Sequence, residues 1–199
     1  MRQTNSNILF TSYDQFLSQF NTNVFGVIML TKAILPHFRQ QRSGSMVFLG
    51  SRSGWYGDPF CGAYAGTKFA LEGLVESLRW ETQPFGIKTL LIEPGRFRTS
   101  FLSDANAQMT KSDIPDYKES SIAFRQNISR EDMTQPGDVE KAVRIILDLV
   151  KGQGVAVGKE VPFRLPLGTD CYETIRDKCR ETLELLDEWR DVITSTDFS

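Results

Sequence analysis

The chain has 199 residues, of which 40% are hydrophobic and 24% charged, a composition that fits one globular domain with a sizeable core rather than two. Its 23 basic and 25 acidic residues are interspersed and leave a formal net charge of -2, which excludes the basic surface of a protein that binds nucleic acid or anionic membranes. We therefore expect a small-molecule partner, with no nucleic acid and no membrane.

The cysteines and the amino terminus favour a cytoplasmic protein. Cys61, Cys171 and Cys179 are odd in number, with neither CxxC spacing nor a nearby histidine cluster, which argues against disulfides and against a metal site. The amino terminus has no apolar core of signal-peptide length, and no apolar run approaches the roughly 20 residues of a membrane span. We expect reduced thiols, a cytoplasmic location and no metal.

The first predicted element is a long helix. Residues 1–10 are irregular, after which Thr11 or Ser12 is a candidate N-cap with Gln15 as its capping-box partner. Apolar residues then recur at three- and four-residue intervals, which predicts a helix over 12–38 with one buried face.

Two short apolar runs predict strands that are buried on both faces. They lie at 45–50 and 87–95, and Pro94-Gly95 stops the second. The apolar pattern between them predicts a helix over 63–81. A strand, a helix and a second strand in this order indicate a parallel sheet.

The rest of the chain predicts a loop and one more strand between helices. Residues 100–133 are polar and lack strong periodicity, which indicates a long substrate lid with a short helix at most. Pro136 suits the first turn of a helix that ends near Gly152. A short strand at 161–165 and an amphipathic helix over 169–192 complete the chain.

This alternation predicts an α/β fold, a partial Rossmann-like doubly wound parallel sheet of about three strands with flanking helices. Three strands are few for such a sheet. If the 45–50 strand lies at the margin, it is an apolar edge with unpaired backbone groups, and we expect poor solubility or self-association from it.

Tyr64 and Lys68 are the first candidate catalytic residues. They stand four residues apart at the start of a predicted helix, hence on one face and one turn from each other. A phenol with a pKa near 10 is a poor proton shuttle at neutral pH, and a neighbouring ammonium favours its ionised form. Alone, the pair has an ordinary alternative as an exposed helix start.

A serine upstream strengthens the pair. Ser51 lies 13 residues before Tyr64 at the carboxyl end of a predicted strand, where α/β folds bind ligands. Its hydroxyl could hold a carbonyl or alcohol oxygen beside the phenol. Ser53 is a rival, either serine could equally be a turn residue bonded to its own backbone, and spacing does not choose between them.

Several segments together resemble one known family. In order and spacing, VFLGSRSG, YAGTK and LLIEPGRFRT are similar to the serine segment, the YxxxK signature and the post-strand PG motif of short-chain dehydrogenases/reductases. FNTNVFGVIMLTKAILPHF is similar to the long central helix of that family, with Asn23 at its active-site asparagine position. The resemblance is strong over Thr11–Arg98 and looser beyond. It implies an oxidoreductase that interconverts a ketone or aldehyde and an alcohol by hydride transfer.

The resemblance also implies a role for each catalytic residue. Tyr64 would exchange a proton with the substrate oxygen, and Lys68 would lower the pKa of Tyr64 and bind the cofactor ribose. Ser51, three residues before the glycine of its segment, would polarise the substrate carbonyl. Asn23 would hold the water that links Lys68 to solvent.

The implied cofactor is NADP or NAD, with NADP favoured slightly. Four residues after the second strand would flank the nicotinamide and its phosphate: Pro94, Gly95, Phe97 and Thr99. Lys32 occupies a helix position that approaches the cofactor in relatives, although a solvated helix lysine is the simpler interpretation. Pro94-Gly95 also has a plain alternative as a turn that ends the strand.

Aromatic residues near these motifs predict an apolar substrate pocket. The candidates are Trp55, Tyr56 and Phe60 in the loop, with Phe97, Phe101 and Met109 on the lid side. Ordinary core packing explains them equally well. The residues therefore support an apolar ketone or secondary alcohol as the substrate and nothing narrower.

The sequence departs from the family at its amino-terminal side. A member normally begins with a strand and a Gly-rich turn against the pyrophosphate, followed by a residue that selects the ribose. Nothing in 1–199 matches these features, and we interpret the chain as a single, incomplete domain that starts at about the fifth strand of the family. We expect the isolated chain to bind the dinucleotide weakly or not at all.

A second interpretation is an inactive interaction protein. The helices predicted over 12–38 and 63–81 form a dimer interface in relatives, which implies a homodimer or tetramer. Joint presence of the four candidate catalytic residues disfavours a purely structural role.

Overall fold

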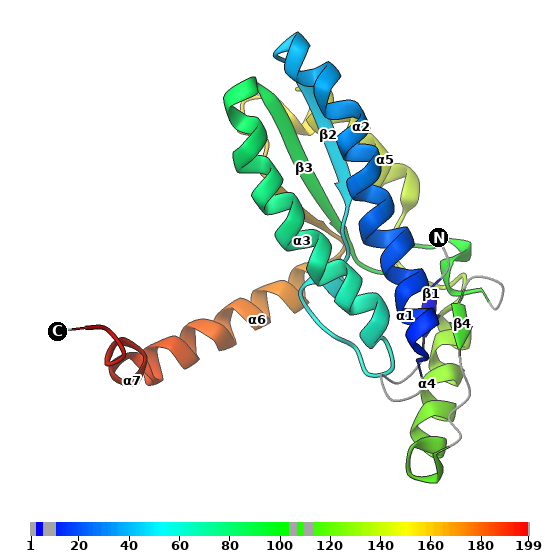
Figure 1. Ribbon diagram of the computed structural model, residues 1–199. Helices are drawn as coiled ribbons and strands as arrows, with labels where there is room; N and C mark the ends of the chain where they lie inside the picture. The colour runs from blue at the N-terminus through cyan, green and yellow to red at the C-terminus, as the bar shows by residue number, and fades with distance from the viewer. Residues whose placement is uncertain (1–2, 6–10, 104–106, 110–113, 199) are drawn as a thin grey trace.

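The fold is built on a three-stranded parallel sheet. The computed structural model describes residues 3–5, 11–103, 107–109 and 114–198. The sheet consists of β2 (Gly44–Leu49), β3 (Ile87–Pro94) and β5 (Arg164–Leu167). β3 lies in the middle and pairs in parallel with both neighbours, so β2 forms an edge within the described residues (Figure 1). The predicted α/β class with a parallel sheet is confirmed.

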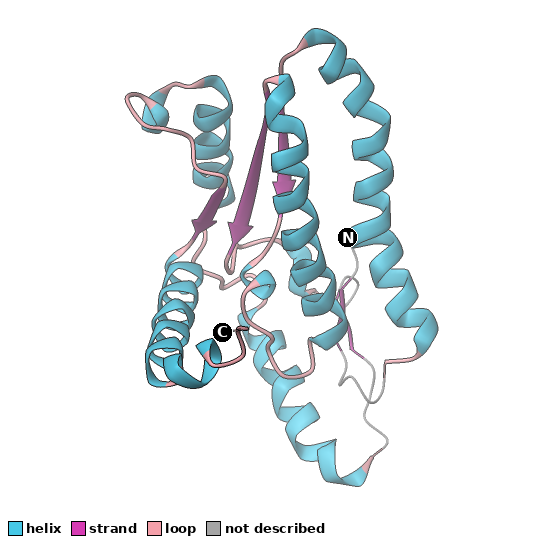
Figure 2. Cartoon of the chain, turned by 60° about the vertical axis from the view of Figure 1, so that its left-hand side comes forward, coloured by secondary structure: helices cyan, strands magenta, loops and turns pink. Residues whose placement is uncertain are grey.

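Helices cover both faces of this sheet. α2 (Gly26–Gln41) and α3 (Gly62–Thr82) lie over one face, and α5 (Val139–Lys151) covers the other (Figures 1 and 2). The buried side chains of the first face are Met46, Phe48, Leu71, Val75, Ile87 and Leu91. On the second face, Leu90 and Ile92 pack against Leu149 of α5. The central strand is therefore buried on both sides, as its unbroken apolar run predicts.

The long amino-terminal helix is present, with one irregular turn. α1 (Tyr13–Phe20) continues through a π-helical turn, Asn21–Phe25, into α2. Ser12 is the N-cap, because its Oγ accepts from Gln15 N at 3.2 Å while Gln15 Oε1 accepts from Ser12 N at 2.9 Å. The capping box is confirmed with Ser12 rather than Thr11. Wide helical turns of this kind frequently occur at functional positions.

Two predictions of irregular structure are wrong in part. β1 (Gln3–Asn5) pairs in parallel with β4 (Ala107–Met109), and three-residue strands are too short to produce a visible alternation. The expected lid, 100–133, contains α4 (Lys118–Glu131), a helix of 14 residues. Ser121 is the buried residue of this helix, so it has almost no apolar stripe for a sequence pattern to reveal.

The carboxyl-terminal elements begin and end a few residues from their predicted positions. α5 begins at Val139 with Asp138 as N-cap, so Pro136 lies before the helix rather than in its first turn. The Asp138 Oδ1 accepts from Glu140 N at 2.9 Å, and this bond fixes the start. The last helix is divided into α6 (Thr169–Glu188) and α7 (Arg190–Thr194).

The edge strand β2 carries exposed apolar side chains. Val47 and Leu49 are 37% and 60% exposed on the face of the sheet that α5 covers elsewhere. The prediction that this strand is buried on both faces is therefore wrong for β2, because no strand or helix of the described residues covers these two side chains. The expected apolar edge is present in the described residues, and the self-association expected from it stays a prediction.

Candidate active site

The predicted catalytic residues converge at the carboxyl ends of β2 and β3. Ser51 follows β2 directly, and Tyr64 and Lys68 lie in the first two turns of α3. Asn23 lies in the π-helical turn that precedes α2, and it contacts α3 through a hydrogen bond. Parallel α/β folds bind ligands at this end of the sheet.

Ser51 and Tyr64 contact each other through their hydroxyls. A hydrogen bond from the Ser51 side chain reaches the phenol, and Ser51 Oγ also accepts from Ser53 N at 3.1 Å. Of the two candidate serines, Ser51 therefore presents its hydroxyl to Tyr64. Burial raises the pKa of Tyr64, which outweighs the lowering effect of the Ser51 hydrogen bond. The phenol is thus held in its protonated form at neutral pH.

Lys68 is buried beside Tyr64 but does not set the protonation of the phenol in this structure. Its Nζ donates to the Leu49 carbonyl at 2.8 Å and lies 5.7 Å from the centre of the Tyr64 ring. Burial lowers the pKa of Lys68 to about 8, and the Glu72 carboxylate opposes this change. The resemblance implied a lowered pKa for Tyr64, whereas burial raises it in this structure.

Asn23 is buried and held by its neighbours. Its Nδ2 donates to Gln19 Oε1 at 3.3 Å and to Thr67 Oγ1 at 3.1 Å, and Thr67 in turn donates to the Tyr64 carbonyl at 2.7 Å. Thr67 thereby ties Asn23 to the helix turn that carries Tyr64. Asn23 Oδ1 is buried with no hydrogen-bond partner, so the site offers an acceptor for a small polar molecule.

The residues predicted to flank a cofactor occupy different environments. Pro94 ends β3, and a Cβ at Gly95 would lie 2.1 Å from Asp170 Oδ1, so this close approach requires glycine. Phe97 packs into the core cluster under α5, and Thr99 Oγ1 accepts from the Phe101 N at 3.2 Å.

Lys32 stands apart from the other candidates. It is exposed on α2, nine residues beyond Asn23 along the helix, or about 13 Å at the usual helical rise. The structure does not bring it to the other candidate residues.

The aromatic candidates divide between the site and the rest of the molecule. Phe101 contacts the Tyr64 ring at 5.8 Å between centroids. Phe60 packs against Phe124 of α4 at 5.3 Å, so α4 contacts the loop after β2. Tyr56 is 46% exposed, and the Met109 side chain lies outside the described residues. Within the described residues, Phe101 is the predicted pocket residue whose ring contacts Tyr64.

Sequence reasoning missed a polar cluster next to this site. It consists of Trp55, Glu72, Glu93 and Arg164, from four separate elements. Glu93 offered one signal, since it is a charged residue inside the apolar run of β3. Thr67 was also missed, although it lies inside the YAGTK segment. The spatial grouping of these residues depends on the registers of β3 and β5, which no local pattern reveals.

Glu93 makes the stability of the fold depend on pH. Burial, with Glu72 also contributing, raises the pKa of Glu93 to about 7, against an ordinary value of 4.5. Since the folded state keeps this proton to higher pH than the unfolded state, the contribution of Glu93 to stability is fully present below pH 4.5 and is lost as pH rises to about 7. Denaturant unfolding at pH 5 and pH 8 should show a loss that is smaller in Glu93→Gln. An equal loss in both proteins would contradict this expectation.

Fold, motifs and site together identify the class. The sequence profile of the short chain dehydrogenase family matches residues 2–110, which is more than half of the chain. The chain belongs to the short-chain dehydrogenase/reductase family.

Individual relatives agree with this assignment. A short-chain dehydrogenase of known structure from Streptomyces avermitilis is 34% identical and superposes with a TM-score of 0.85, covering 99% of this chain and 69% of its own. The 3-ketodihydrosphingosine reductase of Bacteroides thetaiotaomicron is 39% identical over 114 residues, 57% of this chain and 42% of its own. Oxidoreductase BOA17 of Botryotinia fuckeliana is 33% identical over 180 residues, 90% of this chain and 62% of its own. The chain thus spans about half the length of these curated relatives.

The described helices contain no candidate for a membrane span, because none combines sufficient length with sufficient apolar character. No disulfide links the three cysteines, all of which lie in described residues, and Cys61 and Cys171 are buried.

Proposed function

We propose that this chain carries the proton-transfer site of an NAD(P)-dependent oxidoreductase that interconverts a ketone or aldehyde and an alcohol. The observation that carries the proposal is the convergence of Asn23, Ser51, Tyr64 and Lys68 at the carboxyl end of the sheet. Membership of a family whose relatives are named reductases, dehydrogenases and oxidoreductases supports it.

In the reductive direction, the site delivers one proton to the substrate oxygen. The Ser51 hydroxyl donates a hydrogen bond to the carbonyl oxygen and holds it beside the Tyr64 phenol. Tyr64, which burial keeps protonated, then transfers its proton as negative charge develops on that oxygen. The nicotinamide cofactor, when bound, supplies the hydride to the carbonyl carbon.

Lys68 and Asn23 would restore the proton to Tyr64. The Lys68 ammonium has three N–H groups, and one of them donates to the Leu49 carbonyl. The others are available for a ribose hydroxyl and for a water molecule. Asn23 Oδ1, a buried acceptor without a partner, is suited to receive a hydrogen bond from that water. These two groups fit the nicotinamide-ribose end of a dinucleotide.

Pro94 and Gly95, two further residues predicted to bind the cofactor, also fit only the nicotinamide-ribose end of the dinucleotide. Pro94 and Gly95 present backbone at the carboxyl end of β3, close to the turn that carries Ser51. No Gly-rich turn for a pyrophosphate occurs between the described strands and helices. Solved relatives in complex with NADP or with NAD support a nicotinamide cofactor without choosing between the two.

The proposed substrate is apolar. Phe101 lies on Tyr64, and the contact between Phe60 and Phe124 brings α4 over the loop that follows β2. We propose that 100–133 acts as the lid of this site within one domain spanning 1–199. A related protein is named for the reduction of 3-ketodihydrosphingosine, a ketone with a long apolar chain, which supports the same substrate class.

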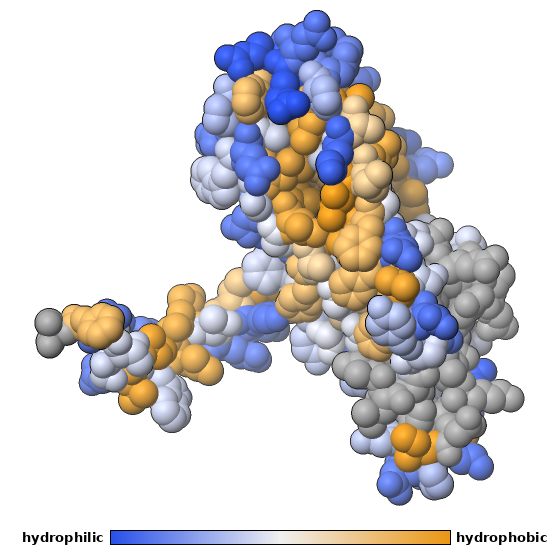
Figure 3. Space-filling model, in the orientation of Figure 1, coloured by the Kyte–Doolittle hydropathy of each residue, from blue (hydrophilic) through white to orange (hydrophobic). Residues whose placement is uncertain are grey.

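A homodimer is a further part of the proposal. Met29 and Leu30 of α2 are 67% and 72% exposed, and Figure 3 shows apolar side chains gathered between α2 and α3. Exposed apolar surface of this kind favours a protein partner. Sedimentation should show a dimer that becomes a monomer in Met29→Glu/Leu30→Glu, whereas the exposed control Gln40→Glu stays dimeric. A monomeric wild-type chain would contradict this.

A fusion protein tests the proposed activity. The part of the Streptomyces avermitilis dehydrogenase that this chain does not match is joined before Met1, because the two proteins share one fold and the match covers 99% of this chain. We expect the fusion to bind NADPH and to reduce apolar ketones. The isolated chain should bind NADPH weakly or not at all in calorimetry. A fusion that folds and binds NADPH but reduces no carbonyl compound would overturn the proposal.

A further inference from the structure

A buried polar cluster lies behind the proton-transfer site, one helical turn beyond Lys68. Glu72 of α3 and Glu93 of β3 are 7% and 1% exposed. Arg164 of β5 contacts both carboxyls, with its Nε 3.0 Å from Glu72 Oε2 and 3.7 Å from Glu93 Oε1. Trp55 Nε1 donates to Glu93 Oε1 at 2.8 Å. None of these four side chains takes part in the proposed proton transfer.

The hydrogen bonds of the cluster leave one oxygen unsatisfied if both carboxyls are ionised. Glu72 Oε1 is buried and has no donor. In the described residues, the hydrogen bonds of the nearby ammonium groups go to other acceptors, because Lys68 donates to the Leu49 carbonyl and Lys178 to the Trp55 carbonyl, and neither donates to Glu72 Oε1. Arg164 divides its guanidinium between Glu72 and Glu76, at 3.0 and 2.6 Å. One proton shared between the two buried carboxyls would supply the missing donor and remove a charge.

The charges around the pair are consistent with this arrangement. Lys68 and Glu76 lie one turn on either side of Glu72 on α3, and Arg164 of β5 contacts Glu72, Glu76 and Glu93. On the α6 side, Cys171 is the titratable group that faces Glu93, and the charges of Asp170 and Arg52 act on that thiol. The Cys171 thiol donates to the Glu93 carbonyl and brings no charge. Burial and the neighbouring Glu72 together raise the pKa of Glu93 to about 7.

Glu72 of this pair also packs against the segment that carries Ser51. A Cβ at Gly50 would lie 2.8 Å from Glu72 Oε1, and a Cβ at Gly54 would lie 2.8 Å from Glu72 Cγ. The backbone on both sides of Ser51 therefore rests on the Glu72 side chain. Because Glu72 also acts electrostatically on Lys68, it contacts the supports of two site residues.

We propose that Glu93 donates a shared proton to Glu72, and that this carboxyl pair is a positioning element that holds Ser51 and Lys68 in place. The catalytic value of holding Ser51 and Lys68 in place rests on the proposed function. The shared proton does not depend on that function. Loss of the proton leaves Glu93 negatively charged beside the Glu72 carboxylate. The repulsion displaces the Glu72 side chain, against which Gly50 and Gly54 pack on both sides of Ser51.

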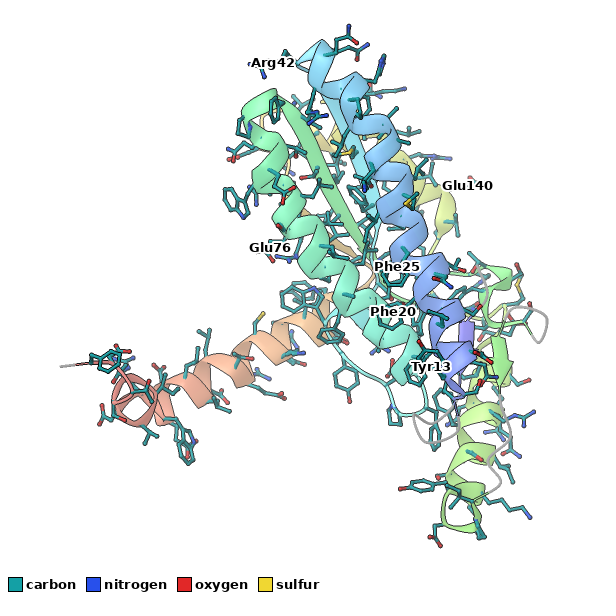
Figure 4. The ribbon with its side chains drawn as sticks, viewed as in Figure 1. Tyr13, Phe20, Phe25, Arg42, Glu76 and Glu140 are labelled. Carbon is teal, nitrogen blue, oxygen red and sulfur yellow. The ribbon has the colours of Figure 1, made fainter. Side chains whose placement is uncertain are left out.

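Carbon-13 NMR of the 199-residue chain, with labelled glutamate carboxyls, tests the shared proton. One carboxyl should titrate near pH 7, more than two pH units above the usual 4.3 for glutamate. This signal should disappear in Glu93→Gln and persist in the control Glu140→Gln, whose side chain is 83% exposed on α5, away from the cluster (Figure 4). If every glutamate of the wild-type chain titrates below pH 5.5 or so, the shared proton is refuted.

The Ser51 amide and the Lys68 side-chain signals test the positioning. In the wild-type chain, the chemical shifts of both should change with pH at the titration midpoint of Glu93. In Glu93→Gln, whose amide still donates to Glu72, neither chemical shift should change at that pH. Signals that stay unchanged through the wild-type titration would overturn the positioning role, even if a variant fails to fold. These measurements need neither cofactor nor substrate, so an inactive fusion with a normal titration would count against the proposed function alone.

Discussion

Replacing Tyr64 by phenylalanine is expected to lower kcat/KM for ketone reduction by the fusion protein about 10²–10⁴-fold, the usual contribution of a general acid. The ring remains, so its packing against Phe101 is kept and only the proton donor is lost. NADPH affinity should stay within about threefold, because the ribose is assigned to Lys68 and this difference corresponds to less than 1 kcal/mol. Steady-state kinetics and NADPH titration measure the two effects separately.

The matched control is Tyr56→Phe. This tyrosine is 46% exposed in the loop before α3, and its ring contacts the Arg52 side chain, so removal of its hydroxyl should leave kcat/KM unchanged. Equal activity of Tyr64→Phe and the wild-type fusion would remove Tyr64 from the mechanism.

Replacing Arg164 by leucine is expected to lower the free energy of unfolding by about 3 kcal/mol. This is the lower end of the range for a broken buried ion pair, because the Arg164 side chain keeps 27% exposure. The change leaves Glu72 buried without its guanidinium partner, and the apolar side chain supplies no donor. For a protein of this size, the melting temperature should fall by roughly 6–12 °C.

The control for this change is Arg144→Leu. Arg144 pairs with Glu140 on the surface of α5, where the two side chains are 75% and 83% exposed. Exposed pairs of this spacing contribute about 0.3–0.5 kcal/mol, so thermal and denaturant unfolding should barely change. A similar loss in both variants would show that the buried cluster adds nothing specific to stability.

The sequence predicted those helices and strands that have a local pattern of capping or apolar residues. Ser12 and Gln15 form the expected capping box, and the apolar runs that contain Phe48 and Leu91 form neighbouring strands. The pair at Tyr64 and Lys68 could be recognised because its spacing is fixed by one helix. These features require no knowledge of distant contacts.

Other features were hidden because they depend on tertiary contacts. α4 has almost no apolar stripe, and the π-helical turn at Asn23 has no distinctive composition. The meeting of Glu72, Glu93 and Arg164 requires the pairing of β3 with β5 and the packing of α3 over both. The pKa of Tyr64 also cannot be predicted from a local sequence pattern, because it depends on burial in the folded chain. Burial raises this pKa, whereas the resemblance implied a lowered one.

Deuterium transfer from the cofactor to the substrate tests hydride transfer at the Tyr64 site most directly. The fusion protein is supplied with an apolar ketone and with NADPH that carries deuterium on its reactive nicotinamide carbon. The alcohol product should contain one deuterium on its carbinol carbon, and a reaction with unlabelled NADPH in deuterated water should place none there. Carbinol deuterium that comes from the solvent, or no alcohol from a fusion that binds NADPH, would contradict the assignment of this site.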